Sequence, residues 1–358
     1  MLSIGIVGLP NVGKSTLFNA VTKSSALAAN YPFATIEPNV GIVPIPDQRL
    51  QKLSLIYPGA KIVPATIRFV DIAGLVAGAS QGEGMGNQFL SHIRTTAAIV
   101  EVVRLFKDDQ VTRVVGSSDP KTDISIINTE LMLADLATID RRLARLDKEA
   151  KSNPKLKPVL KIYDQAKALL NDGKMLHGNL DSDALAVLAD LQLISAKPII
   201  YVFNMDEQEL SDKNLRSELG QLLHPAKTVF VSAKIESELN SLDDDDAIEF
   251  RQSYGLHLSG LESLVTAAYD GLGLQSFLTA GDKEIRAWTI PKGATAPQAA
   301  GVIHTDFQRG FIAAEIVSYS DLIDLGSIAA CRAAGKVRTE GKTYIIQPDD
   351  IVEFRFNV

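Results

Sequence analysis

The chain has 358 residues, of which 46% are hydrophobic and 22% are charged, so it can fill more than one hydrophobic core. Its longest apolar runs, 97–103 and 198–203, are far shorter than the roughly 18 residues that cross a bilayer, so we expect no membrane partner. The net charge of −7 argues against a DNA partner and confines any RNA contact to a local basic patch. The single cysteine, Cys331, cannot form an internal disulfide and fits a cytoplasmic protein.

Short β-rich runs alternate with helical or loop segments over the first hundred residues. The clearest strands are 2–7, 67–70 and 98–103. This alternation is typical of an α/β domain with an open parallel sheet flanked by helices. The strand pattern returns at 197–203 and 226–231 after a long helical stretch, which indicates that the helical stretch is an insertion.

Residues 8–15 read GLPNVGKS and match the phosphate-loop pattern G-x-x-x-x-G-K-[ST] between a strand and a helix. The glycines let successive backbone N–H groups face the phosphates, and the helix N-terminus adds positive potential. Lys14 would bridge the outer phosphates, and Ser15 would bind Mg²⁺. The predicted nucleotide contacts of this loop are Asn11, Val12, Gly13, Lys14, Ser15 and Thr16.

A second phosphate-binding signature follows about sixty residues later. Residues 71–74 read DIAG directly after an apolar strand, like the D-x-x-G of phosphate-loop GTPases. Asp71 would hold Mg²⁺, and the Gly74 amide would sense the third phosphate. The predicted catalytic residues are therefore Lys14, Asp71 and Gly74.

The loop 30–35 lies between these motifs, where we expect the first switch segment. Its Thr35 is our choice for a hydroxyl that binds Mg²⁺, ahead of Thr22 and Thr66, which fall in a predicted helix and a predicted strand. The predicted metal ligands are Ser15, Thr35 and Asp71.

The residue after D-x-x-G is Leu75, where Ras-type enzymes have a glutamine that orients the attacking water. Leucine cannot do this, so hydrolysis is expected to be slow or to depend on another group, a monovalent cation or a partner. Asn11 could present its carbonyl oxygen to K⁺ beside the phosphates, or it could serve only to form the turn.

The stretch after residue 125 has a helical period. Apolar residues recur at spacings of 4, 3, 4 and 3 over 132–146, and a second helical run follows the break at 152–154. We expect a coiled-coil-like hairpin, with simple packing of both helices on the globular body as the alternative. Basic residues of this hairpin are predicted to face RNA, or else to form a solvated face: Arg141, Arg142, Arg145, Lys148, Lys151, Lys155, Lys157 and Lys161.

The strand 199–203 ends in residues that would read the base. Residues 204–207 read NMDE where guanine-specific enzymes have N-K-x-D. Met205 can pack on a base, whereas Glu207 is one methylene too long to accept both guanine donors in good geometry. The Asn204 amide can pair with the amino group and adjacent ring nitrogen of adenine, so ATP is favoured and GTP is weaker. A loop after the next strand completes the predicted base pocket with Ser232, Ala233 and Lys234.

The last eighty residues change to short strands and turns around one or two helices, which indicates a small α+β domain. Its expected strands are 286–290, 313–317, 342–346 and 351–356. The predicted domains are a nucleotide-binding domain (1–125 with 197–277), a helical hairpin (126–196) and a C-terminal domain (278–358).

Several of these runs together resemble the YchF/Ola1 family of Obg-related, ribosome-associated ATPases. The runs that carry the resemblance are 8–15, 30–39, 71–78, 82–87, 204–207 and 286–290. The segments 296–301, 303–307 and 354–358 resemble the TGS domain of that family, a β-grasp module. The resemblance implies a phosphate-loop GTPase-type domain that carries an inserted helical hairpin and is followed by a TGS domain.

The resemblance also implies a cytoplasmic ATPase that associates with ribosomes or ribosomal RNA in translation or stress control. One position departs from the family, because Glu101 stands where the family usually has histidine. We expect a switch protein that hydrolyses ATP to ADP and phosphate. The alternative is a ribosome-binding regulatory module in which nucleotide is an effector and hydrolysis is incidental, or in which GTP is also used. A small-molecule kinase is disfavoured because the hairpin offers no arginine-rich lid.

Overall fold

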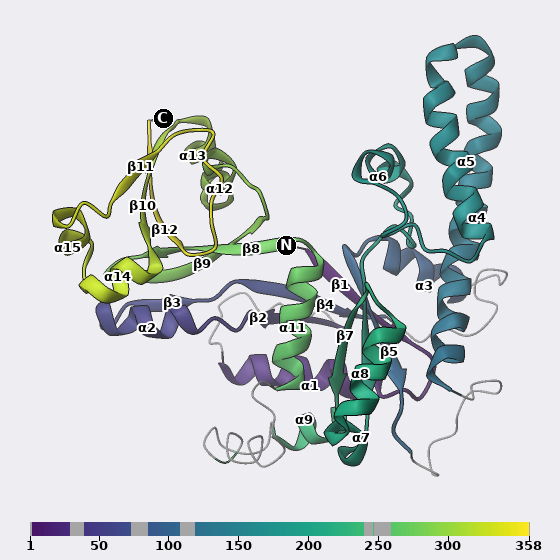
Figure 1. Ribbon diagram of the computed structural model, residues 1–358, viewed down its shortest axis with the longest axis horizontal. Coiled ribbons are helices and arrows are strands. Elements are labelled where there is room, and N and C mark those ends of the chain that lie inside the picture. The colour runs from purple at the N-terminus through teal and green to yellow at the C-terminus, as the bar shows by residue number, and fades with distance from the viewer. Residues whose placement is uncertain are drawn as a thin grey trace. The chain divides into compact units, whose positions relative to one another are not determined.

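A computed structural model gives the arrangement of the helices and strands (Figure 1). It describes residues 2–28, 39–72, 85–107, 119–239, 246 and 259–357. Contacts within the chain divide it into two units, each built around its own sheet. The first unit comprises Met1–Val43 with Arg68–Gly271, and the second comprises Pro44–Ile67 with Leu272–Val358.

Five neighbouring strands in the sheet of the first unit confirm the expected parallel arrangement. Its six strands lie in the order β2 (Val40–Pro44), β4 (Thr66–Asp71), β1 (Ser3–Gly8), β5 (Ala98–Arg104), β6 (Ile199–Asn204) and β7 (Lys227–Val231). The pairs β1–β4, β1–β5, β5–β6 and β6–β7 are all parallel. All seven residues of β5 are buried, as expected for a central strand of a parallel sheet with both faces covered.

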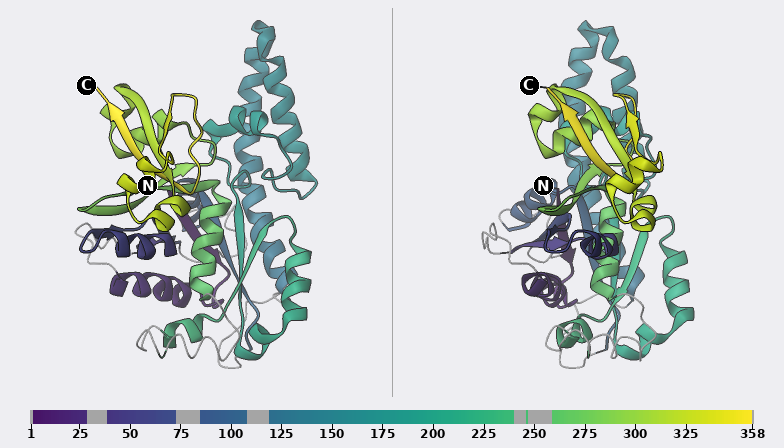
Figure 2. Two further views of the ribbon diagram at one scale, coloured as in Figure 1. Left: turned by 60° about the vertical axis from the view of Figure 1, so that its left-hand side comes forward. Right: turned by 90° about the vertical axis from the view of Figure 1, so that its left-hand side faces the viewer.

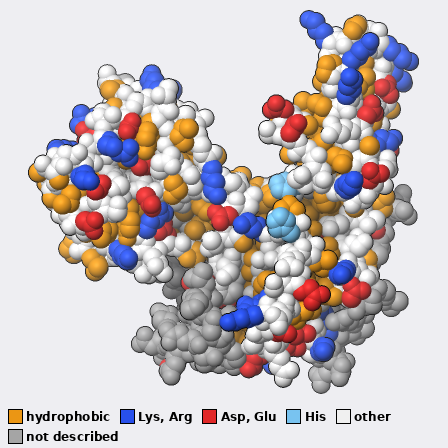
Figure 3. Space-filling model, in the orientation of Figure 1, with side chains coloured by type: hydrophobic (Ala, Val, Ile, Leu, Met, Phe, Trp, Pro, Cys, Tyr) orange, Lys and Arg blue, Asp and Glu red, His pale blue; other side chains and the backbone are white. Residues whose placement is uncertain are grey.

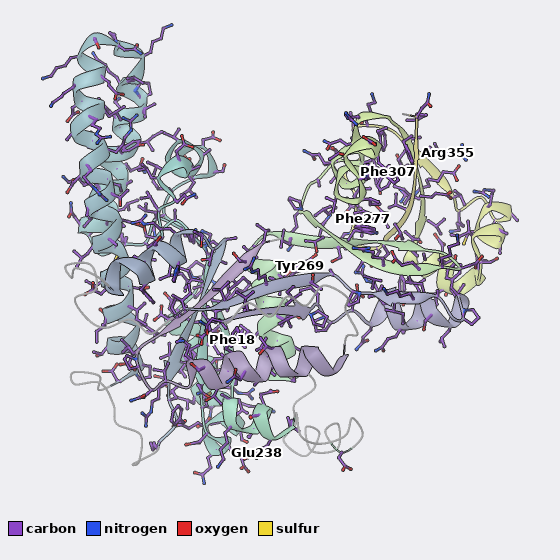
Figure 4. The ribbon with its side chains drawn as sticks, turned by 180° about the vertical axis from the view of Figure 1, so that it is seen from behind. Phe18, Glu238, Tyr269, Phe277, Phe307 and Arg355 are labelled. Atoms are coloured by element: carbon purple, nitrogen blue, oxygen red, sulfur yellow. The ribbon has the colours of Figure 1, made fainter. Side chains whose placement is uncertain are left out.

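Helices cover both faces of this sheet. Ile200 of β6 lies against α11 (Gly260–Gly271), where a Cβ added at Gly271 would come 3.5 Å from the Ile200 Cδ1 atom. The next residue, Tyr201, accepts a hydrogen bond of 3.0 Å at its hydroxyl from Asn128 of α4 (Pro120–Ser152). Successive strand residues point to opposite faces, so α11 and α4 lie on opposite sides of the sheet. The other helices of the unit are α1 (Lys14–Ala28), α3 (Met85–Arg94), α5 (Lys157–Asn171), α6 (Ser182–Leu188), α7 (Glu207–Ser211), α8 (Lys213–Leu222) and α9 (Ala233–Leu239), and Figure 4 labels Phe18 on α1.

The predicted helical hairpin is formed by α4 and α5, which run side by side beyond the sheet (Figures 1 and 2). Helix α4 begins at Pro120 because the Asp119 carboxylate accepts hydrogen bonds from the backbone N–H groups of Lys121 and Thr122. The heptad residues Met132, Ile139, Leu143 and Leu146 of α4 are buried in a core that it shares with α5. Of the apolar residues whose spacing predicts the second helix, Ala166 is buried, whereas Val159, Ile162 and Leu169 are partly buried, and Tyr163 and Leu170 complete the core. The coiled-coil-like packing therefore comes from the heptad spacing.

A buried ion pair holds the middle of α4 near the first sheet. The Asp135 side chain has no exposed surface and accepts hydrogen bonds of 2.7 Å from both the backbone N–H and the hydroxyl of Ser195. Arg94, at the end of α3, lies 3.4 Å from the same carboxylate and also donates to the carbonyls of Ala134 and Gln192. Burial raises the pKa of Asp135, and these donors and the Arg94 cation oppose that rise.

The second unit is built on a mixed sheet, as a β-grasp module requires. Its strands lie in the order β11 (Arg338–Glu340), β10 (Phe311–Ser318), β12 (Asp350–Phe356), β8 (Leu274–Ala280), β9 (Glu284–Pro291) and β3 (Lys61–Val63). Neighbouring strands β8 and β9 form an antiparallel pair, whereas β12 pairs with β8 in parallel. Phe277, labelled in Figure 4, is fully buried in its core. The helices of this unit are α2 (Gln48–Ile56), α12 (Ala296–Ile303), α13 (Thr305–Arg309), α14 (Tyr319–Leu325) and α15 (Ile328–Ala333).

The boundaries of the units differ from the predicted domains, because residues 44–67 belong with the C-terminal sheet. Strand β3 pairs in parallel with β9, and Arg49 of α2 donates to the Pro348 carbonyl and lies 3.2 Å from the Asp349 carboxylate. The second unit also begins at Leu272, six residues before the predicted boundary, because β8 follows directly at Leu274.

The expected strand 342–346 was wrong. The backbone N–H of Tyr344 donates to the Gly341 carbonyl in a turn, and only Ile345 pairs, through an isolated bridge with Thr295. Cys331 is fully buried. Among the described residues, no helix combines the length and the apolar character needed to cross a membrane.

Candidate nucleotide-binding site

The phosphate loop connects β1 to α1 through two residues with left-handed backbone. Asn11 has φ of 64° and Gly13 has φ of 87°. A Cβ atom at Gly13 would also come within 2.2 Å of the Asn204 side-chain nitrogen, so both its φ and its surroundings require glycine. The first helical bond of α1 then forms from the Leu17 N–H to the Gly13 carbonyl at 2.9 Å. This loop presents the helix N-terminus to an anion.

Lys14, Ser15 and Asp71 meet at the carboxyl ends of β1 and β4. The Lys14 ammonium forms an ion pair with one Asp71 oxygen, and the Ser15 hydroxyl donates to the other at 3.3 Å. Both charged side chains are largely buried. The set offers a cation for phosphate together with a carboxylate and a hydroxyl, and Mg²⁺ prefers such oxygen ligands. These residues therefore fit both the nucleotide and its metal.

A cavity of about 570 Å³ opens over this cluster. Its walls come from the phosphate loop, the start of α1 and the end of β4: Leu9, Pro10, Asn11, Gly13, Lys14, Ser15, Thr16, Asn39 and Asp71. Most of the predicted phosphate contacts are thus brought together. Asn39 was not predicted from the sequence to belong to the site. It has φ of 68°, and its carbonyl accepts the Asp71 N–H at 2.8 Å, so it helps to set the position of Asp71.

The structure gives Asn204 a role that was not predicted. Asn204 is 5% exposed, and each end of its amide makes one hydrogen bond within the protein. The nitrogen donates to the Val12 carbonyl at 3.0 Å, and the oxygen accepts the Ala233 N–H at 3.0 Å. The amide keeps a second N–H and a second oxygen lone pair, so its predicted contact with a base stays a prediction. Within the protein it ties the phosphate loop to the loop after β7.

Met205 is also placed differently from the prediction. Its side chain is 1% exposed, and its backbone N–H donates to the Val231 carbonyl at 2.8 Å, so it lies in the core instead of presenting a surface to a base. The neighbouring Asp206 caps α7, where it accepts the Glu209 N–H. Glu207 is exposed, and its carboxylate makes no hydrogen bond or ion pair with any described residue. It remains free to accept from a ligand.

The loop Ser232, Ala233 and Lys234 lies directly after β7, as expected. Ser232 is buried, and its hydroxyl accepts the Ile235 N–H at 3.5 Å. Ala233 bonds to Asn204, and Lys234 is exposed. The predicted base-pocket loop is thus joined to the phosphate loop through one side chain.

Phe106 is a second residue beside the site that was not predicted from the sequence. Its backbone N–H donates to the Asn204 carbonyl at 3.1 Å, and its ring would lie 3.8 Å from a Cβ at Gly13. The Arg104 guanidinium lies 4.4 Å from the centre of the ring. An aromatic residue just beyond the end of a central strand was the only sequence signal for this position.

Three predicted site residues, Thr35, Gly74 and Leu75, lie outside the described residues. Their roles remain predictions. The same holds for the K⁺ contact of Asn11, although Asn11 does line the cavity.

Together, the fold and the site define a phosphate-loop nucleotide-binding protein of the GTPase type. A family model described as "50S ribosome-binding GTPase" matches residues 3–129. A second model, YchF-GTPase_C, described as "Protein of unknown function (DUF933)", matches residues 274–357. The "Ribosome-binding ATPase YchF" of Pasteurella multocida is 49% identical over 358 residues, covering 99% of both chains. The Bacillus subtilis protein of the same name is 47% identical over 364 residues, covering all of both chains.

Solved structures agree with these sequence matches. The Schizosaccharomyces pombe YchF GTPase superposes with a TM-score of 0.87 at 39% identity, covering 99% of this chain and 97% of that one. A GTP-binding protein from Pyrococcus horikoshii shares the fold, with a TM-score of 0.63 at 20% identity. The chain belongs to the YchF family.

Proposed function

We propose that this protein is a cytoplasmic ATPase that hydrolyses ATP to ADP and phosphate and associates with ribosomes as a nucleotide-controlled switch. The observation that carries the proposal is the cluster of Lys14, Ser15 and Asp71 in the phosphate-loop cavity. The names of full-length relatives at 47–49% identity, which describe ribosome-binding ATPases, support both the activity and the partner.

The chemistry of the site is that of phosphate stabilisation. Lys14 would exchange its Asp71 partner for the outer phosphates, and the backbone N–H groups at the start of α1 would donate hydrogen bonds to the remaining phosphate oxygens. Ser15 and Asp71, with Thr35 from the first switch segment, would hold Mg²⁺. When bound, the ion would neutralise charge on the phosphates. No described side chain in the cavity is placed as a general base, so positioning and charge stabilisation would supply the catalysis.

The preference for ATP over GTP rests on Glu207. Its carboxylate is exposed and free among the described residues, at the first position of α7. One oxygen can accept the amino group of adenine, whereas guanine would need two acceptors at the position of a shorter aspartate. The second N–H of the Asn204 amide can reach a ring nitrogen that both purines share, so it does not discriminate.

The ribosome contact is proposed to lie on the hairpin. Of its eight predicted cationic residues, all except the half-buried Arg142 are exposed. Lys and Arg side chains gather around the free end of the hairpin in Figure 3, against an acidic chain average. Ribosomal RNA is the polyanion that such a patch would meet.

Single-turnover hydrolysis of ATP by Lys14→Ala tests the site. We expect hydrolysis to fall to the uncatalysed background, because the variant loses its charge on the outer phosphates. Lys213→Ala, an exposed lysine of α8, is the matched control and should hydrolyse ATP like the wild type. Near-normal turnover by a folded Lys14→Ala protein would reject the assignment.

A further inference from the structure

Glu101 places a carboxyl group on β5, a central strand of the first sheet. It has no exposed surface, and neither of its side-chain oxygens has a hydrogen-bond partner among the described residues. In the sheet it stands between Val7 of β1 and Tyr201 of β6. The next residue of β5, Val102, pairs with Gly8 at the start of the phosphate loop. Glu101 is therefore a buried acid one residue along β5 from the position that pairs with the start of the phosphate loop.

The register shows which face Glu101 occupies. Paired residues on neighbouring strands point to the same face, and Tyr201 reaches Asn128 of α4, so Glu101 faces α4 as well. On that helix Asp123 is 5% exposed, and its Oδ1 atom has no partner in the described part of the chain. The Oδ1 atom of Asn128 is also buried and without a partner there. These buried oxygens therefore have no donor within hydrogen-bond distance among the described residues, although the Tyr201 O–H belongs to the same cluster.

A proton supplies the missing donor. Two ionised carboxyl groups buried side by side would repel each other and would both lose part of their hydration. Burial raises the pKa of the Glu101 carboxyl well above its usual range, and the Asp123 carboxylate raises it further. Tyr201 stays neutral, because burial and Glu101 both raise the pKa of its hydroxyl. The Asp123 carboxylate on α4 acts on Glu101, Glu101 in turn acts on the Tyr201 hydroxyl on β6, and the neighbour of Glu101 on β1 is Val7.

We propose that Glu101 is a protonated acid in the folded chain that donates its O–H to the Asp123 carboxylate, and that this bond anchors the hairpin helix α4 to β5. The proton is taken up from solvent when the chain folds and returns to solvent when Glu101 ionises. The contact exists only while Glu101 holds its proton, so it depends on pH.

A bound cation is the competing explanation for so many buried acceptors. Across the described ranges, no group of three or more His, Cys, Asp and Glu residues is placed to hold a metal ion. A proton needs only two oxygens, so it fits the cluster better.

The sign of the pH effect follows from the raised pKa. Below the usual carboxyl pKa, the folded and unfolded chains both hold the proton. Between that value and the raised folded value, only the folded chain holds it, so stability falls as pH rises. The slope of stability against pH corresponds to about one proton per chain, and the loss of stability is complete once Glu101 has ionised in the folded chain.

Urea unfolding of the full chain from about pH 5 to about pH 9, at constant ionic strength, tests this. The wild type should lose stability with rising pH more steeply than Glu101→Gln, whose amide donates to Asp123 at every pH. Asp123→Asn should flatten the pH dependence in the same way. Equal pH slopes for the wild type and both variants would overturn the proposal.

An infrared measurement covers the case in which a variant does not fold. The wild type at neutral pH should show a carbonyl band of a protonated carboxyl group that Glu101→His lacks. No difference between these spectra would overturn the proposal. It would also be overturned if the unfolding midpoint of the wild type, but not of Glu101→Gln, followed the Na⁺ or K⁺ concentration at fixed ionic strength.

Discussion

At the scale of single residues, Asn204 organises the nucleotide site. Its side chain bridges the carbonyl of Val12 and the N–H of Ala233, and its backbone carbonyl accepts the N–H groups of Leu105 and Phe106. The phosphate loop, the end of β5 and the loop after β7 are therefore all bonded to one residue. Removing the amide would leave a buried carbonyl and a buried N–H without partners.

Asn204→Ala should weaken ATP and GTP binding by the same factor, because it disturbs the loops and not a base-specific contact. The two broken hydrogen bonds are worth about 1–3 kcal/mol, or roughly 5-fold to 150-fold in affinity. Calorimetric titration with non-hydrolysable analogues measures both affinities, and Asn214→Ala on the exposed side of α8 is the control. A selective loss of ATP binding would mean that Asn204 does read adenine.

Glu207→Asp should raise the affinity for GTP relative to ATP, by about tenfold. The shorter carboxylate reaches the position from which aspartate accepts both guanine donors. The ratio of the two affinities is the measured quantity, and Glu218→Asp on exposed α8 should leave it unchanged. The base assignment fails if the wild type already prefers GTP or if the ratio does not move.

The phosphate loop could be predicted because its pattern fixes local backbone geometry. Gly13 and the order of Lys14 and Ser15 are sufficient to specify that turn. The roles of Asn204 and Met205 could not be predicted in this way, because both residues are buried by segments that are distant in the chain. A pattern gives residue types at a site, but not which of their polar atoms the protein itself already uses.

At the scale of elements, the hairpin carries much of its positive charge unneutralised. Arg142 pairs with Glu149 at 3.1 Å, and Lys167 pairs with Asp140 at 2.6 Å. Arg145 is exposed, with no ion pair to any residue in the described part of the chain. Such side chains are available to phosphates.

Neutralising Arg141, Arg142 and Arg145 together as glutamine should weaken ribosome association and flatten its dependence on salt. Removing one Arg–phosphate pair lowers the slope of log affinity against log salt by roughly one. Co-sedimentation over a salt series measures that slope, and ATP affinity should not change. A triple change of exposed lysines away from the free end, Lys121, Lys213 and Lys227 to glutamine, controls for net charge. An unchanged slope would reject the patch.

The two helices of the hairpin could be predicted because their heptad spacing is a local signal. The place of β3 in the second sheet could not be predicted from such a signal. This strand has only three residues, and its partner β9 lies more than two hundred residues further along the chain. Local periodicity carries no information about such a pairing, so residues 44–67 were expected in the wrong unit.

At the scale of the whole molecule, the chain passes between its two units three times. Two of these crossings, near residues 43 and 67, flank the segment that links the predicted first switch to Asp71. The second unit thus interrupts the nucleotide-binding unit between two of its phosphate-sensing motifs. Nucleotide binding and ribosome association are the two activities that this architecture is proposed to connect.

The most direct test of this account is ATP turnover with and without ribosomes, at matched K⁺ concentrations. We expect slow turnover alone and an increase of about a hundredfold or more with ribosomes, because an activating partner must supply what Leu75 cannot. Lys14→Ala should show no increase. Unchanged turnover with ribosomes at every K⁺ concentration, while ribosome binding still depended on the nucleotide, would contradict the ATPase switch and favour a regulatory module in which hydrolysis is incidental.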